Sequence, residues 1–154
     1  MSACRNRGRR RIRKGETEVE TARHRILIVD DEVNLLDALS RVFKMEGYEV
    51  ITSQNALEAI ELLKKVQPVS LILSDQKMPG MEGVRFLETV KEISPLSTRV
   101  IMTGLQDAAL MERSASQAEV FRFLTKPVDL DMLLEVVALG VQRYETLRDG
   151  THED

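Results

Sequence analysis

Residues 26–31, with the sequence Ile-Leu-Ile-Val-Asp-Asp, place four consecutive β-prone apolar residues directly before two acids. An apolar run without polar alternation is typical of a strand that is buried on both faces of a parallel sheet. The amphipathic segment 33–46 follows, with apolar residues at helical spacing, and it stops beside Gly47, a residue type that commonly ends helices. This succession of strand, acidic loop and helix predicts the first unit of an α/β fold.

The same alternation continues along the chain. It predicts further strands at 48–52, 69–73, 100–102 and 120–124, and further helices at 55–66, 83–93, 107–116 and 129–147. Asp129 stands where the last helix would need an N-cap. Five strands alternating with five helices predict a doubly wound, five-stranded parallel sheet of order 2-1-3-4-5, which is a flavodoxin-like α/β fold.

Length and composition suit one globular domain. The chain has 154 residues, of which 43% are hydrophobic and 31% charged, so it can bury a core and remain soluble. Cys4 is the single cysteine and has no internal partner for a disulfide. No apolar run approaches the roughly 18 residues of a membrane span, and none resembles a secretory signal. We therefore expect a cytoplasmic protein that does not bind a membrane.

Charge is distributed unevenly along the chain. Residues 1–25 hold nine Lys/Arg and three Glu, whereas residues 26–154 carry a net charge of −9. We expect a disordered basic leader at 1–23, a folded domain at 24–148 and an acidic tail at 149–154. The leader could attract nucleic acid or other polyanions without sequence preference. Apart from it, nothing in the sequence favours binding to nucleic acid.

Polar residues gather at the predicted carboxyl ends of the strands. Asp30 and Asp31 follow the first strand, and Asp75 follows the third. Thr103 follows the fourth strand and Lys126 the fifth. In open α/β sheets, the functional site lies at these strand ends, where the winding reverses. We therefore expect these five side chains to form one site.

The residue types at these positions indicate phosphoryl chemistry. Three clustered carboxylates repel one another unless a cation joins them, and Asp30, Asp31 and Asp75 offer oxygen ligands that suit Mg²⁺. Asp75 is the best nucleophile, because an ionised carboxylate can attack phosphorus. Lys126 would neutralise charge on the incoming group, and Thr103 would form a hydrogen bond with a phosphoryl oxygen.

The chain resembles the response-regulator receiver family of two-component and phosphorelay systems over about residues 24–147. Four motifs carry the resemblance: ILIVDDE at 26–32, LILSDQKMPGMEG at 71–83, VIMTG at 100–104 and FLTKP at 123–127. Together they are specific to this family.

The resemblance assigns roles to individual residues. It implies that Asp75 accepts a phosphoryl group from a sensor histidine kinase or a phosphotransfer protein. It also implies that Asp30, Asp31 and the backbone carbonyl of Gln76 hold Mg²⁺ beside the acceptor. The peptide bond between Lys126 and Pro127 is expected to be cis, an isomer that X-Pro bonds tolerate.

The resemblance further implies a conformational switch. Thr103 would move toward a new phosphoryl oxygen, and Phe123, at the position of the family's switch aromatic, would fill the vacated space. Phosphorylation would thus bias a two-state equilibrium and change the surface of helix 4, strand 5 and helix 5. Two residues bear on the lifetime of the phosphoryl group. Gly104 stands where the family more often has alanine, and Lys77 lies two residues after the acceptor.

Other functions are less compatible with the sequence. A haloacid-dehalogenase-like phosphatase would need a second aspartate where Lys77 stands, and a flavodoxin-type nucleotide or flavin module would need a glycine-rich loop after the first strand. We expect no enzyme activity beyond the protein's own phosphorylation and dephosphorylation. For the output, we favour a single-domain receiver that acts on an unidentified protein partner. The alternative is a receiver from a larger regulator with a DNA-binding or cyclic-dinucleotide output domain.

The predicted last helix, at 129–147, is apolar on more than one face. A helix that is apolar beyond its core stripe suggests a second buried surface. We therefore predict a homodimer or partner interface through the helix 4–strand 5–helix 5 surface.

Overall fold

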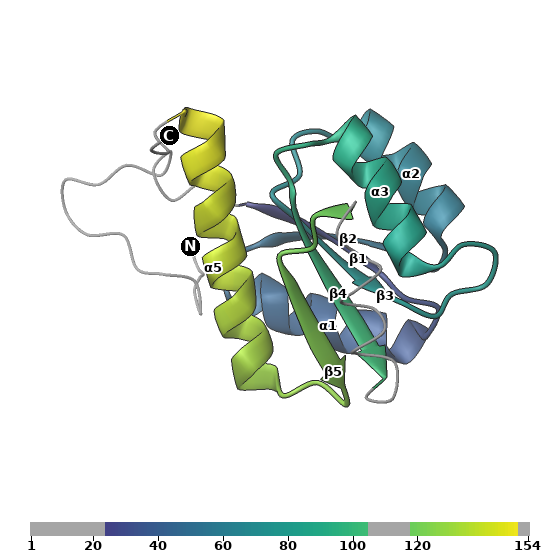
Figure 1. Cartoon of the computed structure of the whole chain (residues 1–154). Helices are drawn as coiled ribbons and strands as arrows, with labels where there is room; N and C mark the ends of the chain where they lie inside the picture. The colour runs from purple at the N-terminus through teal and green to yellow at the C-terminus, as the bar shows by residue number, and fades with distance from the viewer. Residues whose placement is uncertain (1–23, 105–117, 151–154) are drawn as a thin grey trace.

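The computed structural model describes residues 24–104 and 118–150, which form a five-stranded parallel sheet between two layers of helices (Figure 1). The strands are β1 (Arg25–Val29), β2 (Glu49–Ser53), β3 (Leu71–Asp75), β4 (Thr98–Gly104) and β5 (Arg122–Lys126). The helices are α1 (Val33–Met45), α2 (Ala56–Lys65), α3 (Gly83–Ile93) and α5 (Leu130–Asp149). The sheet order β2-β1-β3-β4-β5 confirms the predicted doubly wound topology.

Four of the five predicted helices are confirmed. The helix predicted at 107–116 lies outside the described residues, as do the predicted basic leader at 1–23 and residues 151–154 of the predicted tail.

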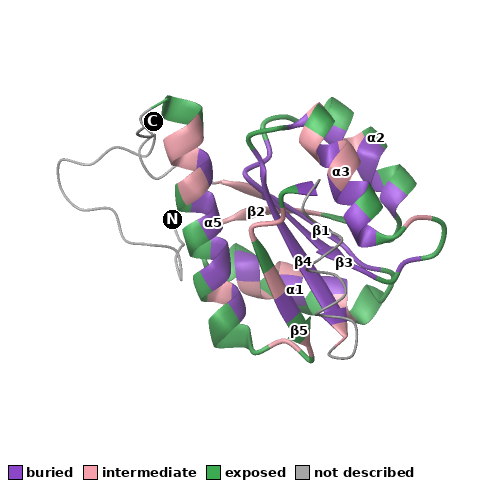
Figure 2. Ribbon diagram, viewed as in Figure 1, coloured by how far each residue is buried: buried purple, intermediate pink, exposed green. Residues whose placement is uncertain are grey.

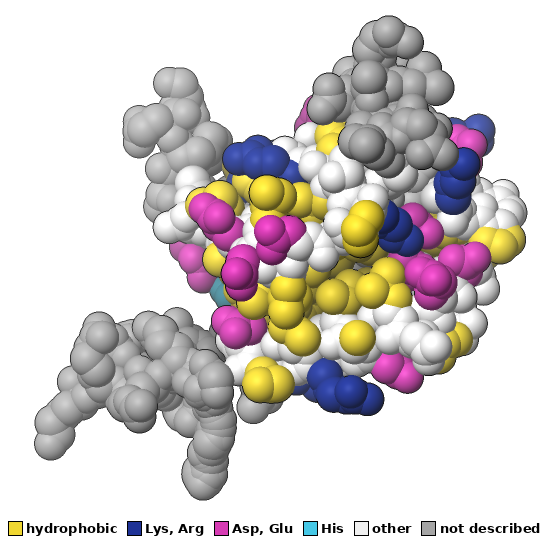
Figure 3. Space-filling model, turned by 90° about the horizontal axis from the view of Figure 1, so that it is seen from below, with side chains coloured by type: hydrophobic (Ala, Val, Ile, Leu, Met, Phe, Trp, Pro, Cys, Tyr) yellow, Lys and Arg dark blue, Asp and Glu magenta, His cyan; other side chains and the backbone are white. Residues whose placement is uncertain are grey.

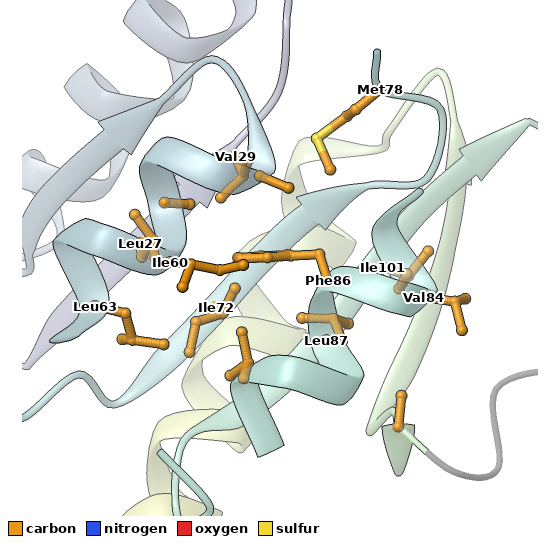
Figure 4. Close-up of a cluster of buried hydrophobic side chains, with 14 of the residues drawn as sticks. Leu27, Val29, Ile60, Leu63, Ile72, Met78, Val84, Phe86, Leu87 and Ile101 are labelled. Atoms are coloured by element: carbon orange, nitrogen blue, oxygen red, sulfur yellow. The ribbon is translucent and has the colours of Figure 1, made fainter. Parts of the chain in front are cut away.

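Alternate residues of each strand enter two separate cores. In β1, Ile26 and Ile28 pack with α1 and α5, whereas Leu27 and Val29 pack with α2 and α3. Figure 4 shows the core beneath α2 and α3, where Phe86 is fully buried. Figure 2 shows the same arrangement by burial: the central strands β1, β3 and β4 are buried, and the outer faces of the helices are exposed. Because helices cover both faces of the sheet, the central strands β1 and β3 are mainly apolar, whereas the edge strands β2 and β5 carry polar residues.

Several predicted strand bounds are wrong. The third and fifth strands end two residues later than predicted, and Asp75 is the last residue of β3, where it pairs with Met102. The fourth strand is longer than predicted and includes Arg99, which is 1% exposed. The Arg99 guanidinium donates hydrogen bonds to the carbonyl oxygens of Ala118 at 2.7 Å and Ser97 at 2.9 Å. A polar residue can therefore stay within a buried strand, because the fold satisfies its polar atoms.

The ends of α5 follow ordinary capping chemistry. The Asp129 side chain accepts hydrogen bonds from the backbone amides of Asp131 and Met132, which confirms the predicted N-cap. The helix runs two residues further than predicted, to Asp149, and Gly150 follows as its C-cap with a φ of 67°, which favours glycine. Among the described helices, neither this one nor any other is long and apolar enough to cross a membrane.

Apolar residues do cover more than one face of α5, as predicted. Leu133 and Val137 are fully buried against the sheet. Leu130, Met132 and Leu139 are 44%, 53% and 40% exposed. The interface inferred from this pattern remains a prediction.

Candidate functional site

Parallel pairing brings the predicted site residues to one end of the sheet. Val29 pairs with Ser74, so Asp30 and Asp75 lie side by side at the ends of adjacent strands. Gly104 pairs with Lys126, which places the lysine at the end of β5. The residues come from separate segments of the chain, and the sheet register alone aligns them.

Lys126 joins the two buried acids. Its Nζ lies 3.2 Å from Asp30 Oδ2 and 3.2 Å from Asp75 Oδ1. Asp30 is fully buried and Asp75 is 6% exposed. The other oxygen of Asp30, Oδ1, accepts a hydrogen bond from the backbone amide of Glu32 at 2.8 Å, which fixes the orientation of this carboxylate.

Asp31 completes a group of three acids at the solvent side. One oxygen from each of Asp30, Asp31 and Asp75 lies within 4.8 Å of the others. Asp31 does not cap α1, because the N-cap residue of that helix is Glu32, which makes no side-chain cap hydrogen bond. Its exposed carboxylate is therefore not committed to the helix end.

Thr103 and Phe123 lie on the same side of the sheet as the α2–α3 core. The Thr103 side chain is 1% exposed, and its Oγ1 has no hydrogen-bond partner among residues 24–104 and 118–150. An unsatisfied buried hydroxyl costs about 1–3 kcal/mol, so this group would gain from a new acceptor. Phe123 is half-buried, pairs with Ile101 and packs against that core. Its movement on phosphorylation stays a prediction.

The loop after β3 is closed by Gln76. Its carbonyl oxygen accepts a hydrogen bond from the Gly83 amide at 2.9 Å, and its side-chain Oε1 accepts one from the Val84 amide at 2.9 Å. The carbonyl predicted to bind a metal thus already has a protein partner. A role for it as a ligand stays a prediction, and the case for a metal rests on the three carboxylates. No pattern in the sequence indicates this role of the Gln76 side chain.

The peptide bond between Lys126 and Pro127 is cis, as the family resemblance implied.

Burial and charge shift the pKa values of the central pair. Burial raises the pKa of Asp75, and the neighbouring Asp30 carboxylate raises it further, against the opposing effect of Lys126. Burial alone would lower the pKa of Lys126, but Asp30 and Asp75 outweigh it, so this pKa lies above its ordinary value. The Lys126 ammonium stands against the three carboxylates of Asp30, Asp31 and Asp75, and a divalent cation with a preference for oxygen ligands fits this donor set.

A cavity of about 530 Å³ lies between α1 and the start of α5, next to Lys126. Its walls are mainly apolar and include Leu35, Leu39, Val128 and Leu130. Figure 3 views the molecule from the end toward which the strands point, and it shows hydrophobic side chains gathered between groups of acidic ones. The site therefore borders a surface that could receive part of another molecule.

Known proteins resemble this chain in sequence and in fold. The family model described as the response regulator receiver domain matches residues 26–138. The chain belongs to the response regulator receiver family.

This receiver domain is similar to curated proteins of different lengths. It is 38% identical over 124 residues to the hydrogenase transcriptional regulatory protein HoxA of Bradyrhizobium diazoefficiens, covering 80% of this chain but only 25% of HoxA. It is 34% identical over 113 residues to sporulation initiation phosphotransferase F of Bacillus subtilis, covering 73% of this chain and 90% of that protein. The chain thus spans about a quarter of the HoxA length.

Solved structures agree with the fold of the receiver. The solution structure of the beryllofluoride-activated NtrC4 receiver domain dimer has a TM-score of 0.72 and 30% sequence identity. The match covers 78% of this chain and 98% of that one.

Replacing Asp75 by Asn should stabilise the metal-free receiver at neutral pH. The raised pKa of Asp75 means that the folded state keeps this proton to a higher pH than the unfolded chain does. Wild-type stability should therefore rise as pH falls through the raised folded pKa, with the full gain reached below the ordinary carboxyl pKa. At pH 7 we expect Asp75→Asn to raise the free energy of unfolding by on the order of 1 kcal/mol, and the difference should shrink in acid.

Urea unfolding in the presence of a chelator, at pH 7 and in acid, measures this difference. Asp37→Asn is the matched control, because Asp37 is an exposed aspartate on α1, and its effect should stay within about 0.5 kcal/mol. A less stable Asp75→Asn protein at pH 7 would contradict the electrostatic account.

Proposed function

We propose that this receiver is a phospho-acceptor switch in which Asp75 takes a phosphoryl group from a sensor histidine kinase or phosphotransfer protein. One observation carries the proposal: Asp75 lies almost buried at a strand end, 3.2 Å from the Lys126 ammonium and beside two further acids. Family membership supports the same assignment. The only catalysis we propose is that of the protein's own phosphorylation and dephosphorylation.

In the transfer, a carboxylate oxygen of Asp75 attacks the phosphorus of a phosphohistidine. The new O–P bond forms as the P–N bond breaks, and the imidazole nitrogen takes the electron pair. Lys126 faces the incoming oxygens with positive charge, and the Thr103 hydroxyl donates a hydrogen bond to one of them. Because Lys126 also lowers the pKa of Asp75, it favours the ionised form that attacks.

Asp30, Asp31 and Asp75 would hold Mg²⁺ at this site. Their oxygens lie close together, and the Lys126 ammonium contacts the carboxylates of Asp30 and Asp75. When bound, the ion supplies positive charge against the charge that develops on the phosphoryl oxygens.

The readout would follow from Thr103 and Phe123. The Thr103 hydroxyl, which has no hydrogen-bond partner within 24–104 and 118–150, gains an acceptor when a phosphoryl group arrives, and this favours one of two conformations. Phe123 would then repack and alter the surface around β5 and α5. The receiver would act in the cytoplasm.

The cavity beside Lys126 supports docking of the phosphodonor protein there. Its apolar walls, together with Glu32 in its lining, suit an amphipathic helix with basic flanks, from which a histidine could reach Asp75. The output remains divided between two candidates. The length of the Bacillus subtilis relative favours a single-domain relay protein, whereas HoxA favours the receiver of a larger transcriptional regulator.

Acetyl phosphate with Mg²⁺ should add one phosphoryl group to the wild type and none to Asp75→Ala, as measured by intact mass. Asp37→Ala is the matched control, because it removes an exposed aspartate that is not one of the three clustered acids, and it should be labelled like the wild type. A chelator should abolish labelling. Unlabelled wild-type protein, or equal labelling of Asp75→Ala, would refute the proposal.

A phosphorylation-dependent homodimer through α5 is the proposed oligomeric form. Exposed Leu130, Met132 and Leu139 offer apolar surface on this helix, and the related NtrC4 receiver is described as an activated dimer.

Light scattering should show that Mg²⁺ with beryllofluoride shifts the wild type from monomer to dimer. Leu139→Glu should keep the protein monomeric, because burying an unpaired charge in the interface is costly. Leu57→Glu makes the same change at an exposed position on α2, 65% exposed, and should still dimerise. A wild type that stays monomeric with beryllofluoride bound would rule out this dimer.

A further inference from the structure

Gln76, the residue directly after Asp75, is polar but only 3% exposed. Its backbone amide donates to the Met102 carbonyl oxygen at 2.9 Å, and its own carbonyl accepts from the Gly83 amide at 2.9 Å. Its side-chain Oε1 accepts from the Val84 amide at 2.9 Å, while Nε2 donates to Glu82 Oε1 at 3.3 Å. All its polar groups are engaged, and they join the end of β3 to the start of α3.

The first turn of α3 lacks a hydrogen bond from the side chain of its own N-cap residue. The first amides of a helix have no partners within the helix, and an N-cap side chain normally satisfies one of them. The N-cap residue of α3 is Glu82, which makes no side-chain cap hydrogen bond. Gln76 supplies the missing acceptor from outside the helix, at the Val84 amide.

The first turn of α3 in turn touches the main chain of the acceptor. A Cβ atom on Gly83 would collide with the Asp75 carbonyl oxygen, so the helix lies against this peptide group. The same carbonyl accepts a hydrogen bond from Ser74 Oγ at 2.9 Å. Any shift of this turn would therefore move the backbone that carries the Asp75 carboxylate.

We propose that Gln76 is a positioning residue for the acceptor. Its amide side chain fixes the first turn of α3 against the Asp75 main chain, and thereby holds the Asp75 carboxylate where it binds Mg²⁺ and accepts the phosphoryl group. This inference rests on the proposed phospho-acceptor function. Gln76 is not catalytic, because its side chain bonds to α3 and to the loop before it.

Gln76→Met tests the inference, because methionine has a similar size but cannot accept a hydrogen bond of this strength from the Val84 amide. Supporting contacts of this kind typically contribute 10–100-fold to metal affinity or activity. We expect Mg²⁺ alone, titrated by calorimetry, to bind about tenfold more weakly. Labelling by acetyl phosphate at saturating Mg²⁺ should be about tenfold slower. If Gln76→Met does not fold, Gln76→Asn serves instead, because its shorter side chain cannot reach Val84.

Val90→Ala separates positioning from stability. Val90 is fully buried in the same helix, so its truncation should destabilise the fold through a cavity. The hydrogen bonds of the Gln76 side chain go to Glu82 and Val84, so the cap does not depend on the Val90 side chain. The Mg²⁺ affinity and labelling rate of Val90→Ala should stay near those of the wild type.

The double variant Gln76→Glu with Glu82→Gln provides a rescue at unchanged net charge. The new carboxylate at position 76 still accepts a hydrogen bond from the Val84 amide. The new side-chain amide at position 82 donates a hydrogen bond to that carboxylate. Mg²⁺ affinity and labelling should return most of the way to the wild-type values.

The outcomes are distinguishable. Wild-type affinity and rate in Gln76→Met would overturn the positioning role and leave the phospho-acceptor function intact. A double variant as impaired as Gln76→Met would also overturn it, because the hydrogen bond would then not be the cause. Failure of the wild type to be labelled would instead refute the proposed function itself.

Discussion

The contact of the Lys126 ammonium with both Asp30 and Asp75, at 3.2 Å each, is the interaction on which the site depends. It exists only because strands β1, β3 and β5 are parallel and end at the same edge of the sheet. One ammonium cannot balance three clustered carboxylates. A divalent cation such as Mg²⁺ would relieve the repulsion among these carboxylates. Such a site responds strongly to the arrival of a cation or a phosphoryl group, which is what a switch requires.

Much of the fold could be predicted because both faces of the sheet are buried. That burial makes strands such as Ile26–Val29 uninterrupted apolar runs, and the handedness of crossovers then restricts the strand order. The ends of the strands could not be predicted from polarity. Arg99 is a buried strand residue whose guanidinium is satisfied by Ala118, 19 residues further along the chain. Such long-range compensation is not visible in a local pattern.

The acids and the lysine of the site could be predicted for a similar reason. The carboxyl ends of parallel strands lie at the same end of the sheet, so Asp30, Asp75 and Lys126 come together independently of the conformations of the intervening loops. The side-chain role of Gln76 could not be predicted, because its partner Val84 depends on how the loop closes. Gly83 ends the motif at 71–83, but its close approach to the Asp75 carbonyl oxygen is visible only in the three-dimensional structure. Loops after strand ends therefore hold the features that sequence patterns leave out.

A crystal structure with Mg²⁺ and beryllofluoride, which stands in for the phosphoryl group, tests the central claim most directly. The account predicts one beryllofluoride bonded to the Asp75 carboxylate, with Lys126 and Thr103 contacting its fluorines. Mg²⁺ should lie beside it, held by Asp30 and Asp31. Beryllofluoride bonded to another residue, or Mg²⁺ bound away from these carboxylates, would contradict the account.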